Sequence, residues 1–325
     1  MNISELENLL TRFPALTLLV LGDYFLDFYL EIDSALAEIS LETGLEAHQV
    51  VQTRAHPGAA GTVTSNLRAL GVNVIALGVI GDDGNGYELQ RALRETGVDI
   101  TPLIVSRERV TPTYTKPLCD GVELNRLDIK NRVALAPEIE NELITRLCEL
   151  LSRVNGIVVV DQVHEDVGGI VTAQVRDEIA RVAEEKIVVA ESRARCGEFR
   201  NVIVQANLGE AKRATGADSI EACGTELRRR TNRPAYITAG ANGIFVFDEL
   251  GCAQIPAIPV SEPMDTVGAG DSVLAGFTAA LCAGANARAA AYIANLVASV
   301  TIRQIGTTGT ATPAQVLAAH DRIQT

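Results

Sequence analysis

Short apolar runs alternate with longer amphipathic segments over most of the chain. Unbroken apolar runs of this length are typical of strands that are buried on both faces of a sheet, and apolar residues three or four positions apart indicate helices. The predicted strands cover residues 16–21, 74–80, 157–160, 187–190, 202–205, 235–239 and 244–247. The predicted helices cover residues 3–10, 58–70, 86–96, 138–154, 171–185, 272–283, 287–304 and 312–324, with another starting near 210. This alternation predicts an α/β fold with a doubly wound, mostly parallel sheet and helices on both faces.

Two regions break this rhythm because they contain short alternating segments that are more polar. Residues 28–32 and 48–53 lie in the first region, and residues 111–118 and 122–129 lie in the second. Alternation of this kind suits strands with one exposed face. We therefore expect one domain over residues 1–325, with a small β-sheet lid formed from about 29–55 and 108–131.

The composition of the chain limits which partners and which cellular compartment are expected. Apolar residues make up 47% of the chain and aromatic residues 4%, so Val, Ile, Leu and Ala must build the core. The formal net charge of −13 argues against nucleic acid as a partner, because binding to phosphate backbones needs clustered Lys and Arg. There is no run of 18 apolar residues and no basic leader, and the six cysteines are scattered without a CxxC pair. These features predict a cytoplasmic protein that does not contact a membrane.

The most informative stretch is Asp265-Thr-Val-Gly-Ala-Gly-Asp271, which precedes a predicted helix. A glycine-rich loop that opens into a helix presents unpaired backbone N–H groups and the positive end of the helix dipole to an anion. A carboxylate at that point, Asp271, is suited to accept a proton from a hydroxyl that attacks a bound phosphate. The pattern indicates a kinase, although a capped turn would look similar. It matches neither the P-loop nor the dinucleotide fingerprint.

Polar side chains follow several of the predicted strands, where ligands bind in doubly wound sheets. They are Asp23, Asp27, Asp161, Glu191, Asn207 and Glu210. Such residues also end strands as turn formers and helix caps, so each alone is weak evidence. The Asn207-x-x-Glu210 spacing puts two oxygen donors one helical turn apart, which suits a water-coordinated Mg²⁺. The loop Gly58-Ala-Ala-Gly61 would admit a ligand to backbone amides, or it would serve close packing of a helix on the sheet.

On these motifs the chain resembles the ribokinase-like (PfkB) carbohydrate kinase family, whose DxxGAGD motif stands at 265–271. The resemblance implies that Asp271 is the catalytic base and that the amides around Gly268, Ala269 and Gly270 form the anion hole. It implies ATP and Mg²⁺ as cofactors. Nucleotide and metal contacts are expected from Asn207, Glu210, Thr238, Gly240, Gly243, Asp265 and Asn295. Acceptor contacts are expected from Asp23, Asp27, Gly58, Ala59, Asn66, Lys116 and Asp161. A monovalent cation such as K⁺ is a family-based expectation near Asp265 and residues 307–308.

Within the family the chain is most similar to the kinase half of bacterial heptose-phosphate kinase/adenylyltransferases. This likeness is carried by segments 22–27, 57–58 with Asn66 and 70–71, 111–116, 126–128 and 305–307. No adenylyltransferase segment is expected within the chain. The departures lie at the acceptor end. The family's GGxxN reads Gly58-Ala59-Ala-Gly-Thr62, DYxKG reads Asp161-Gln-Val-His164, and DPK reads Glu191-Ser-Arg193. The motifs that serve phosphate transfer are intact.

The hypothesis from sequence is an ATP-dependent kinase that acts on a sugar or a sugar phosphate, with a heptose-phosphate-like acceptor favoured. Lys116, Arg126 and Arg193 would bind an acceptor phosphate, or they are simply solvated. Free edges on the lid strands suggest a homodimer formed through the lid. Two alternatives stay open. One is a catalytically weak sensor of sugar or nucleotide on the same fold, and the other is a nucleotide-binding enzyme of different chemistry.

Overall fold

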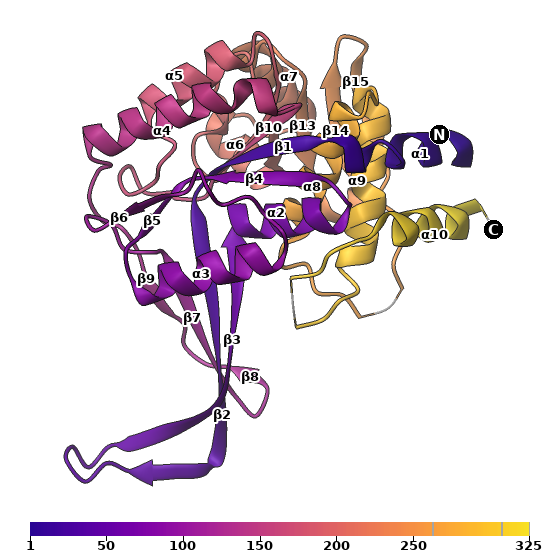
Figure 1. Cartoon of the computed structure of the whole chain (residues 1–325). Helices are drawn as coiled ribbons and strands as arrows, with labels where there is room; N and C mark the ends of the chain where they lie inside the picture. Colours follow the sequence, from indigo (N-terminus) through magenta and orange to yellow (C-terminus); the bar gives the residue numbers. More distant parts are fainter. Residues whose placement is uncertain (262, 307, 325) are drawn as a thin grey trace.

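An eight-stranded sheet lies at the centre of the molecule in the computed structural model (Figure 1). The structure describes residues 1–261, 263–306 and 308–324. The strand order is β15-β14-β13-β12-β11-β10-β1-β4. All pairs from β13 to β4 are parallel, whereas β14 and β15 are antiparallel at one edge. The strands are β1 (Thr17–Gly22), β4 (Asn73–Leu77), β10 (Gly156–Asp161), β11 (Ile187–Ser192), β12 (Ile203–Asn207), β13 (Ala235–Thr238), β14 (Ile244–Asp248) and β15 (Gly251–Ile255). The predicted doubly wound, mostly parallel sheet is confirmed.

Helices cover both faces of this sheet, and each face has its own apolar core. Strand β1 shows the division, because Leu18 and Val20 pack in one core and Leu19 and Leu21 in the other. Strands buried on both faces therefore need the continuous apolar runs seen in the sequence. The first core is covered by α1 (Ile3–Leu10), α2 (Ala60–Ala69), α3 (Gly84–Glu95), α8 (Ala269–Cys282), α9 (Ala287–Thr301) and α10 (Pro313–Gln324). The second is covered by α4 (Pro137–Leu150), α5 (Ala173–Val182), α6 (Leu208–Thr215) and α7 (Ile220–Thr231).

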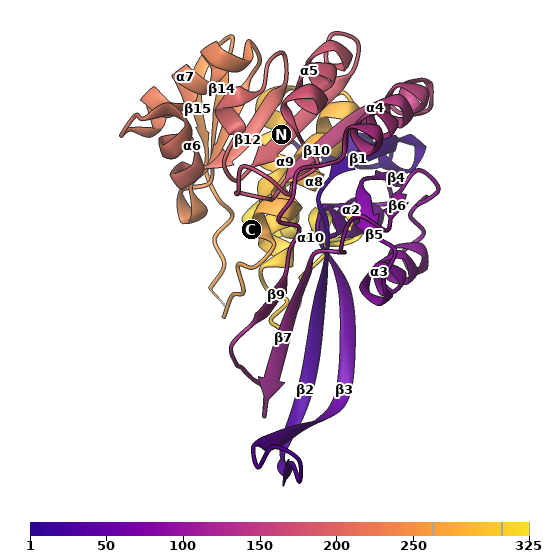
Figure 2. The ribbon, with the colours of Figure 1, turned by 90° about the vertical axis from the view of Figure 1, so that its left-hand side faces the viewer.

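A second sheet forms the lid, and its long hairpin projects away from the main body (Figure 2). Its strand order is β3-β2-β7-β8, and β9 also pairs with β7. The strands are β2 (Tyr24–Ile39), β3 (Glu46–Ala59), β7 (Thr113–Cys119), β8 (Val122–Glu123) and β9 (Leu127–Ile129). Of the segments predicted to be exposed, residues 48–53 of β3 are mostly exposed, whereas residues 28–32 of β2 are half-buried and include the buried Ile32. The inner end of β2 is buried and that of β3 is largely half-buried, and the lid joins the body at Tyr24 and Ala59.

Two predictions of secondary structure need correction. The single strand predicted over 74–80 is two strands, because β4 ends at Leu77 and β5 (Val79–Gly81) pairs with β6 (Ile104–Ser106) in another sheet. Gly78 separates them where the chain passes close to β1, since a Cβ atom there would lie 2.7 Å from the carbonyl oxygen of Gly22. Helix α7 and strand β15 were not predicted, because α7 buries few apolar side chains and β15 is a short edge strand that buries none of its side chains fully.

Candidate active site

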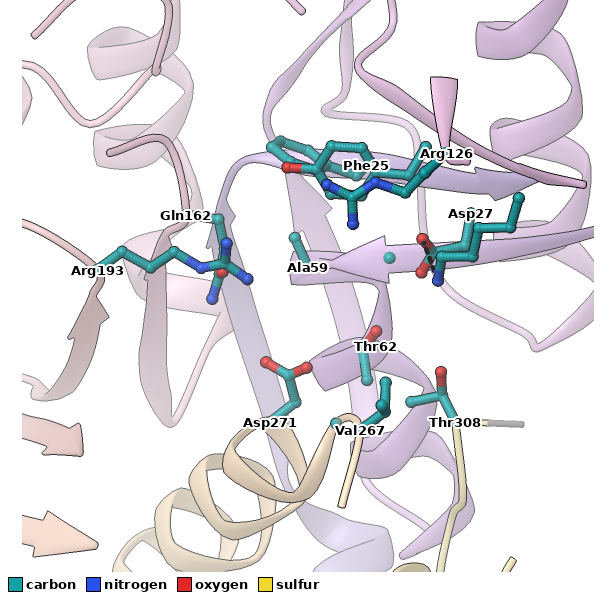
Figure 3. Close-up of a pocket in the computed structure, with 14 residues that line it drawn as sticks. Phe25, Asp27, Ala59, Thr62, Arg126, Gln162, Arg193, Val267, Asp271 and Thr308 are labelled. Carbon is teal, nitrogen blue, oxygen red and sulfur yellow. Dashed lines mark ion pairs between the residues drawn. The ribbon is translucent and has the colours of Figure 1, made fainter. Parts of the chain in front are cut away.

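One cavity of about 180 Å³ lies between the lid and the start of helix α8 (Figure 3). Strand β2 contributes Phe25 and Asp27, and helix α8 contributes Asp271 from below in this view. The full lining comprises Phe25, Asp27, Gly58, Ala59, Thr62, Tyr114, Lys116, Arg126, Gln162, Arg193, Val267, Gly268, Asp271 and Thr308. The cavity therefore joins the predicted phosphate loop to the inner ends of the lid strands.

The loop at Gly268 begins α8 in a way that leaves backbone donors available. Gly268 has a φ of 76°, and a Cβ atom there would lie 2.6 Å from Cγ2 of Thr308, so a larger residue would not fit. Among the described residues, no side chain caps this helix start. The first N–H groups of a helix have no partner within the helix, and their dipoles favour an anion. The Ala269 N–H already donates to the Thr266 carbonyl at 3.2 Å, and the anion hole at Gly268, Ala269 and Gly270 stays a prediction.

Asp271 lies in the first turn of α8, and its carboxylate points into the cavity (Figure 3). Burial raises the pKa of Asp271 to about 7; the positive charge of Arg193 opposes this rise and the negative charge of Asp27 adds to it. An ordinary aspartate has a pKa near 4. A carboxylate that ionises near neutral pH is suited to act as a general base, because it is both available and basic enough to take a proton.

The Glu191 carboxylate lies close enough to both Asp271 and Glu210 to be affected by their charges. Burial and the charges of Asp271 and Glu210 raise the pKa of Glu191 well above its usual range, and its buried Oε2 atom has no hydrogen-bond partner. Burial also raises the pKa of Glu210, although hydrogen bonds with Asn207 oppose the rise. An unpartnered buried carboxylate oxygen between two other carboxylates fits a nearby cation. No group of three metal-ligating side chains occurs among the described residues. The residues thus fit Mg²⁺ held largely through water and phosphate oxygens, its usual mode.

The predicted Asn207-x-x-Glu210 motif has a second role in the structure. The Asn207 side chain accepts a hydrogen bond of 2.9 Å from the Glu210 N–H, and the Glu210 carboxylate accepts one of 2.8 Å from the Asn207 N–H. This is a capping box at the start of α6. The capping box uses one side-chain oxygen of each residue. A magnesium role for this pair stays a prediction, and the pair would contact the ion through water.

Opposite charges meet at the acceptor end of the cavity. Nζ of Lys116 lies 3.1 Å from Oδ1 of Asp27 and donates to the Tyr29 hydroxyl at 3.2 Å. Burial lowers the pKa of Lys116, but Asp27 and Tyr29 outweigh it, so the pKa rises and the side chain is a cation. The Asp27 carboxylate needs the glycine beside it, because a Cβ atom on Gly58 would lie 2.7 Å from Oδ2.

Two arginines add positive charge to the same cavity. The Arg126 guanidinium lies 4.0 Å from the centre of the Tyr114 ring, and two hydrogen bonds of 2.6 and 2.9 Å to Asp128 fix it. Arg193 points toward the space above Asp271 (Figure 3), and within the described chain its guanidinium has no ion-pair partner. Three cationic side chains therefore converge on one small cavity, which favours an anionic ligand.

Ala59 adopts an unusual backbone conformation on the cavity wall. Its φ is 53° and its ψ is −116°, a region that favours glycine. The family pattern has a glycine at this position. A conformation of this kind costs roughly 1–3 kcal/mol in a residue with a Cβ atom. Thr62, at the place of the family's asparagine, also lines the cavity. Both departures of this motif from the family pattern, Ala59 and Thr62, therefore change the lining of the cavity.

Three of the predicted acceptor residues do not line the cavity. The Asp23 carboxylate accepts hydrogen bonds from the backbone N–H groups of Gln162, Val163 and Ile170, at 2.9 to 3.2 Å. Asp161 is fully buried; it accepts a hydrogen bond from Ser192 at 2.6 Å and forms an ion pair with Arg195 at 2.6 Å. Asn66 is also fully buried, and its amide donates to the Thr62 carbonyl within α2. These residues support the cavity from outside its lining. Asp23, for example, anchors the loop that carries Gln162 into the cavity.

The predicted nucleotide residues lie outside the cavity. Asn295 donates to the carbonyl oxygens of Ile255 and Pro256, both at 3.0 Å. Gly243 has a φ of 82° and packs on the same segment, since a Cβ atom there would lie 2.1 Å from the Ile255 oxygen. A nucleotide-binding edge formed by these residues together with Gly240 stays a prediction. Thr238, at the end of β13, makes a long contact of 3.5 Å with the Ala206 carbonyl.

The predicted monovalent-cation site is described only in part. Oδ1 of Asp265 accepts from the Val267 N–H at 3.0 Å and Oδ2 from the Gly306 N–H at 3.2 Å, so both oxygens brace the loops around the cavity. Thr307 lies outside the described residues. A K⁺ ion at this place stays a prediction.

Sequence reasoning missed several lining residues, chiefly Phe25, Tyr114, Gln162 and Val267, and it named Thr308 only as part of a cation site. The rings of Phe25 and Tyr114 meet edge to face with their centres 5.2 Å apart. A signal for both was present, because Phe25 and Asp27, like Tyr114 and Lys116, are two positions apart and so share a face of their strand. Gln162 gave no such signal, since its loop is placed by Asp23.

Comparison with known proteins agrees with this geometry. The model of the pfkB family of carbohydrate kinases matches residues 28–315. The chain is 30% identical over 329 residues to the bifunctional protein HldE of Geobacter sulfurreducens, covering 98% of this chain and 65% of that protein. It is 29% identical to the HldE protein of Trichlorobacter lovleyi, covering 98% of this chain and 66% of the relative. The chain thus spans about two thirds of the length of these relatives.

Solved structures show the same fold at lower identity. The ribokinase of Arabidopsis thaliana, solved with ribose and ATP, superposes with a TM-score of 0.69 at 17% identity, covering 94% of this chain and 98% of that one. The ribokinase of Thermotoga maritima gives a TM-score of 0.69 at 17% identity, covering 94% and 99%. No helix among the described residues is long and apolar enough to cross a membrane. The fold is that of ribokinases, and the chain belongs to the pfkB family of carbohydrate kinases.

Proposed function

We propose that this carbohydrate kinase transfers the γ-phosphate of ATP to a hydroxyl group of a sugar phosphate, with Asp271 as the general base. The observation that carries the proposal is the placement of Asp271. Its carboxylate lies at an uncapped helix start, has a pKa of about 7, and shares one cavity with Asp27 and Lys116. A phosphate-binding element, a base and an acceptor-binding surface are thereby within reach of one small molecule.

The acceptor we favour carries a phosphate of its own. Lys116, Arg126 and Arg193 line a cavity of about 180 Å³, and a neutral sugar would leave at least one of these charges without a counterion. Asp27 is available for acceptor hydroxyls on the face opposite Lys116. The sequence resemblance to heptose-phosphate kinases points to the same class of acceptor, so a heptose phosphate is the first candidate.

The proposed reaction is an in-line displacement at phosphorus. The acceptor hydroxyl gives its proton to the Asp271 carboxylate as its oxygen forms a bond to the γ-phosphorus, and the bond from that phosphorus to the β–γ bridging oxygen breaks to release ADP. Backbone N–H groups at Gly268 to Asp271 would stabilise the negative charge that develops on the transferred group. Magnesium, held near Glu191 and Glu210 through water, would neutralise charge on the phosphates. Arg193 would lie beside the transferred group.

In our proposal the lid excludes water from the site. It also forms the contact between two copies of the chain. Strands β2 and β7 carry Phe25, Asp27, Tyr114 and Lys116 into the cavity, so movement of the lid would open or close the acceptor site. The outer part of the lid exposes large apolar side chains, including Ile39, Val50, Val51, Val122 and Leu127. Exposed apolar side chains that gather on one part of a surface are suited to contact with another protein. We propose a homodimer in which lid packs on lid.

A second candidate function is a sensor that binds sugar and nucleotide with little turnover. The observation that favours it is the replacement of two residues in the cavity, Ala59 and Thr62, relative to the family pattern. Because Asp271 and the loop before it keep the arrangement needed for transfer, we prefer the kinase. A sensor would bind the same ligands without releasing ADP.

The experiment that separates these functions is a coupled ADP-release assay over free and phosphorylated pentoses, hexoses and heptoses. We expect acceptor-dependent ADP release with at least one phosphorylated sugar and a phosphorylated product by mass spectrometry. Asp271→Ala should abolish it, whereas Asp218→Ala, at an exposed aspartate in the connection between α6 and α7, should not. Tight binding of a sugar phosphate without ADP release would instead support the sensor.

A further inference from the structure

Ala59 combines two properties that no other described residue combines. It has a left-handed backbone in spite of its Cβ atom, and it lines the cavity. The other described non-glycine residues with positive φ are Asp120, Asn201 and Asn232, and none of them lines the cavity. Aspartate and asparagine tolerate this region because their short polar side chains bond locally, but alanine gains nothing of the kind.

The backbone of Ala59 is fixed from both directions. On one side it is the last residue of β3 and pairs with Tyr24, while Gly58 pairs with Phe25. On the other side helix α2 starts at Ala60, whose N–H donates to the Asp23 carbonyl at 3.1 Å. The chain therefore cannot relax the conformation without breaking the strand pairing or the helix start. Glycine would adopt it without strain.

Packing does not explain the methyl group either. Ala60 next to it is fully buried in the core on the α2 face, whereas Ala59 is only half-buried and faces the cavity. A methyl group in the core would gain burial and dispersion contacts that offset strain. One that faces a ligand cavity gains them only when a ligand is present. The strain at Ala59 therefore points to the ligand.

We propose that Ala59 determines acceptor specificity, and that its methyl group excludes acceptors with a hydroxyl at the ring position facing it. This inference rests on the proposed kinase function. The neighbouring residue has the opposite role, since Gly58 leaves room for the Asp27 carboxylate, where the proposed function places an acceptor hydroxyl. The two positions together favour an acceptor that directs a hydroxyl toward Asp27 and none toward the Ala59 methyl group. Discrimination by one carbon group in a pocket is about 10- to 200-fold.

The test compares wild type with Ala59→Gly on one sugar phosphate accepted by the wild type and on its epimers and monodeoxy analogues. We expect the wild type to prefer one analogue that lacks a hydroxyl, or carries it on the other ring face, over its hydroxyl-bearing counterpart. In Ala59→Gly the ratio of kcat/KM for that pair should fall by about 10-fold or more. The midpoint of thermal unfolding should rise at the same time, because glycine relieves the strain.

Asn232→Gly serves as the matched control, since it also replaces a residue with positive φ, at the C-terminal end of α7 and away from the cavity. Its selectivity should equal that of the wild type. A higher unfolding midpoint in Ala59→Gly with unchanged selectivity would overturn the inference, and so would a lower midpoint. If the wild type releases no ADP with any acceptor, it is the proposed function that fails, and the inference fails with it.

Discussion

The Nζ atom of Lys116 lies 3.1 Å from the Oδ1 atom of Asp27, across neighbouring strands of the lid. Each side chain is mostly buried, with exposed fractions of 13% and 15%. The pair places a fixed cation and a fixed anion side by side at the acceptor end of the cavity. In our account the anion binds acceptor hydroxyls and the cation binds the acceptor phosphate.

Lys116→Gln should therefore weaken use of phosphorylated acceptors more than use of free sugars. Hydrogen bonds to charged groups contribute about 1.5–3 kcal/mol, so we expect kcat/KM for the sugar phosphate to fall about 10- to 100-fold, mainly through KM. Steady-state kinetics on a matched pair of free and phosphorylated sugars measures this. Lys212→Gln, at an exposed lysine of α6, should leave both values unchanged. An equal loss on both sugars would mean that Lys116 only orients Asp27.

Arg193 should set the pH dependence of turnover. Its charge lowers the pKa of Asp271, which burial and Asp27 raise to about 7. The base must be ionised to act, so the wild-type rate should fall as pH drops below about 7. Arg193→Gln removes the opposing charge, so the pKa of Asp271 should rise and the acidic limb of the kcat profile should move to higher pH. Arg193→Lys should keep the limb near its wild-type position.

A limb that moves to lower pH in Arg193→Gln would contradict this assignment. Exposed Arg132, which lies outside the cavity lining, provides a control through Arg132→Gln, whose profile should match that of the wild type.

The framework of the site was predictable from sequence because it depends on local patterns. The loop at Gly268, the helix that carries Asp271, and Asp27 on its strand are each specified by residues within a few positions of one another. The roles of Asp23 and Asp161 were not predictable, since they depend on partners far along the chain. Asp23 is bonded to Gln162, Val163 and Ile170, and only the folded sheet brings these backbone groups to it.

The capping box of Asn207 and Glu210 illustrates a different limit. The same spacing predicts a metal-binding pair and a helix cap, and the structure shows the cap. The sequence showed that Ala59 replaces a glycine of the family pattern, but it did not show that the backbone there keeps a positive φ. The positive φ arises because the pairing of β3 fixes the chain before this residue and the start of α2 fixes it after.

The proposed homodimer predicts that charge on the outer lid will yield monomers. Val122 and Leu127 are 66% and 62% exposed, and both project from the lid. Val122→Asp combined with Leu127→Asp should halve the mass measured by light scattering after size exclusion, because buried unpaired charges are costly. Tyr87→Asp, at a 62% exposed residue of α3 on the main body, is the control and should remain dimeric. A wild-type protein that is monomeric at micromolar concentration would refute the lid contact.

Asp271→Asn is informative only if the variant is folded, and the pKa of the wild-type residue predicts that it will be. A carboxyl group whose pKa is raised on folding lowers stability as pH rises from about 4 through about 7, since the folded state holds a proton that the unfolded chain has released. An uncharged asparagine avoids this cost. The variant should therefore unfold at the same or a higher temperature than the wild type at pH 8, and the two should converge toward pH 4.

The most direct test of the account is the rate of phosphoryl transfer by Asp271→Asn in a single turnover, with ATP, Mg²⁺ and the best acceptor bound. Removal of a general base commonly costs about 10² to 10⁴ in rate. We predict a loss in that range at pH 8, with the dissociation constants for ATP and the acceptor changed less than about threefold. A transfer rate equal to that of the wild type would contradict the assignment of Asp271 and with it the proposed mechanism.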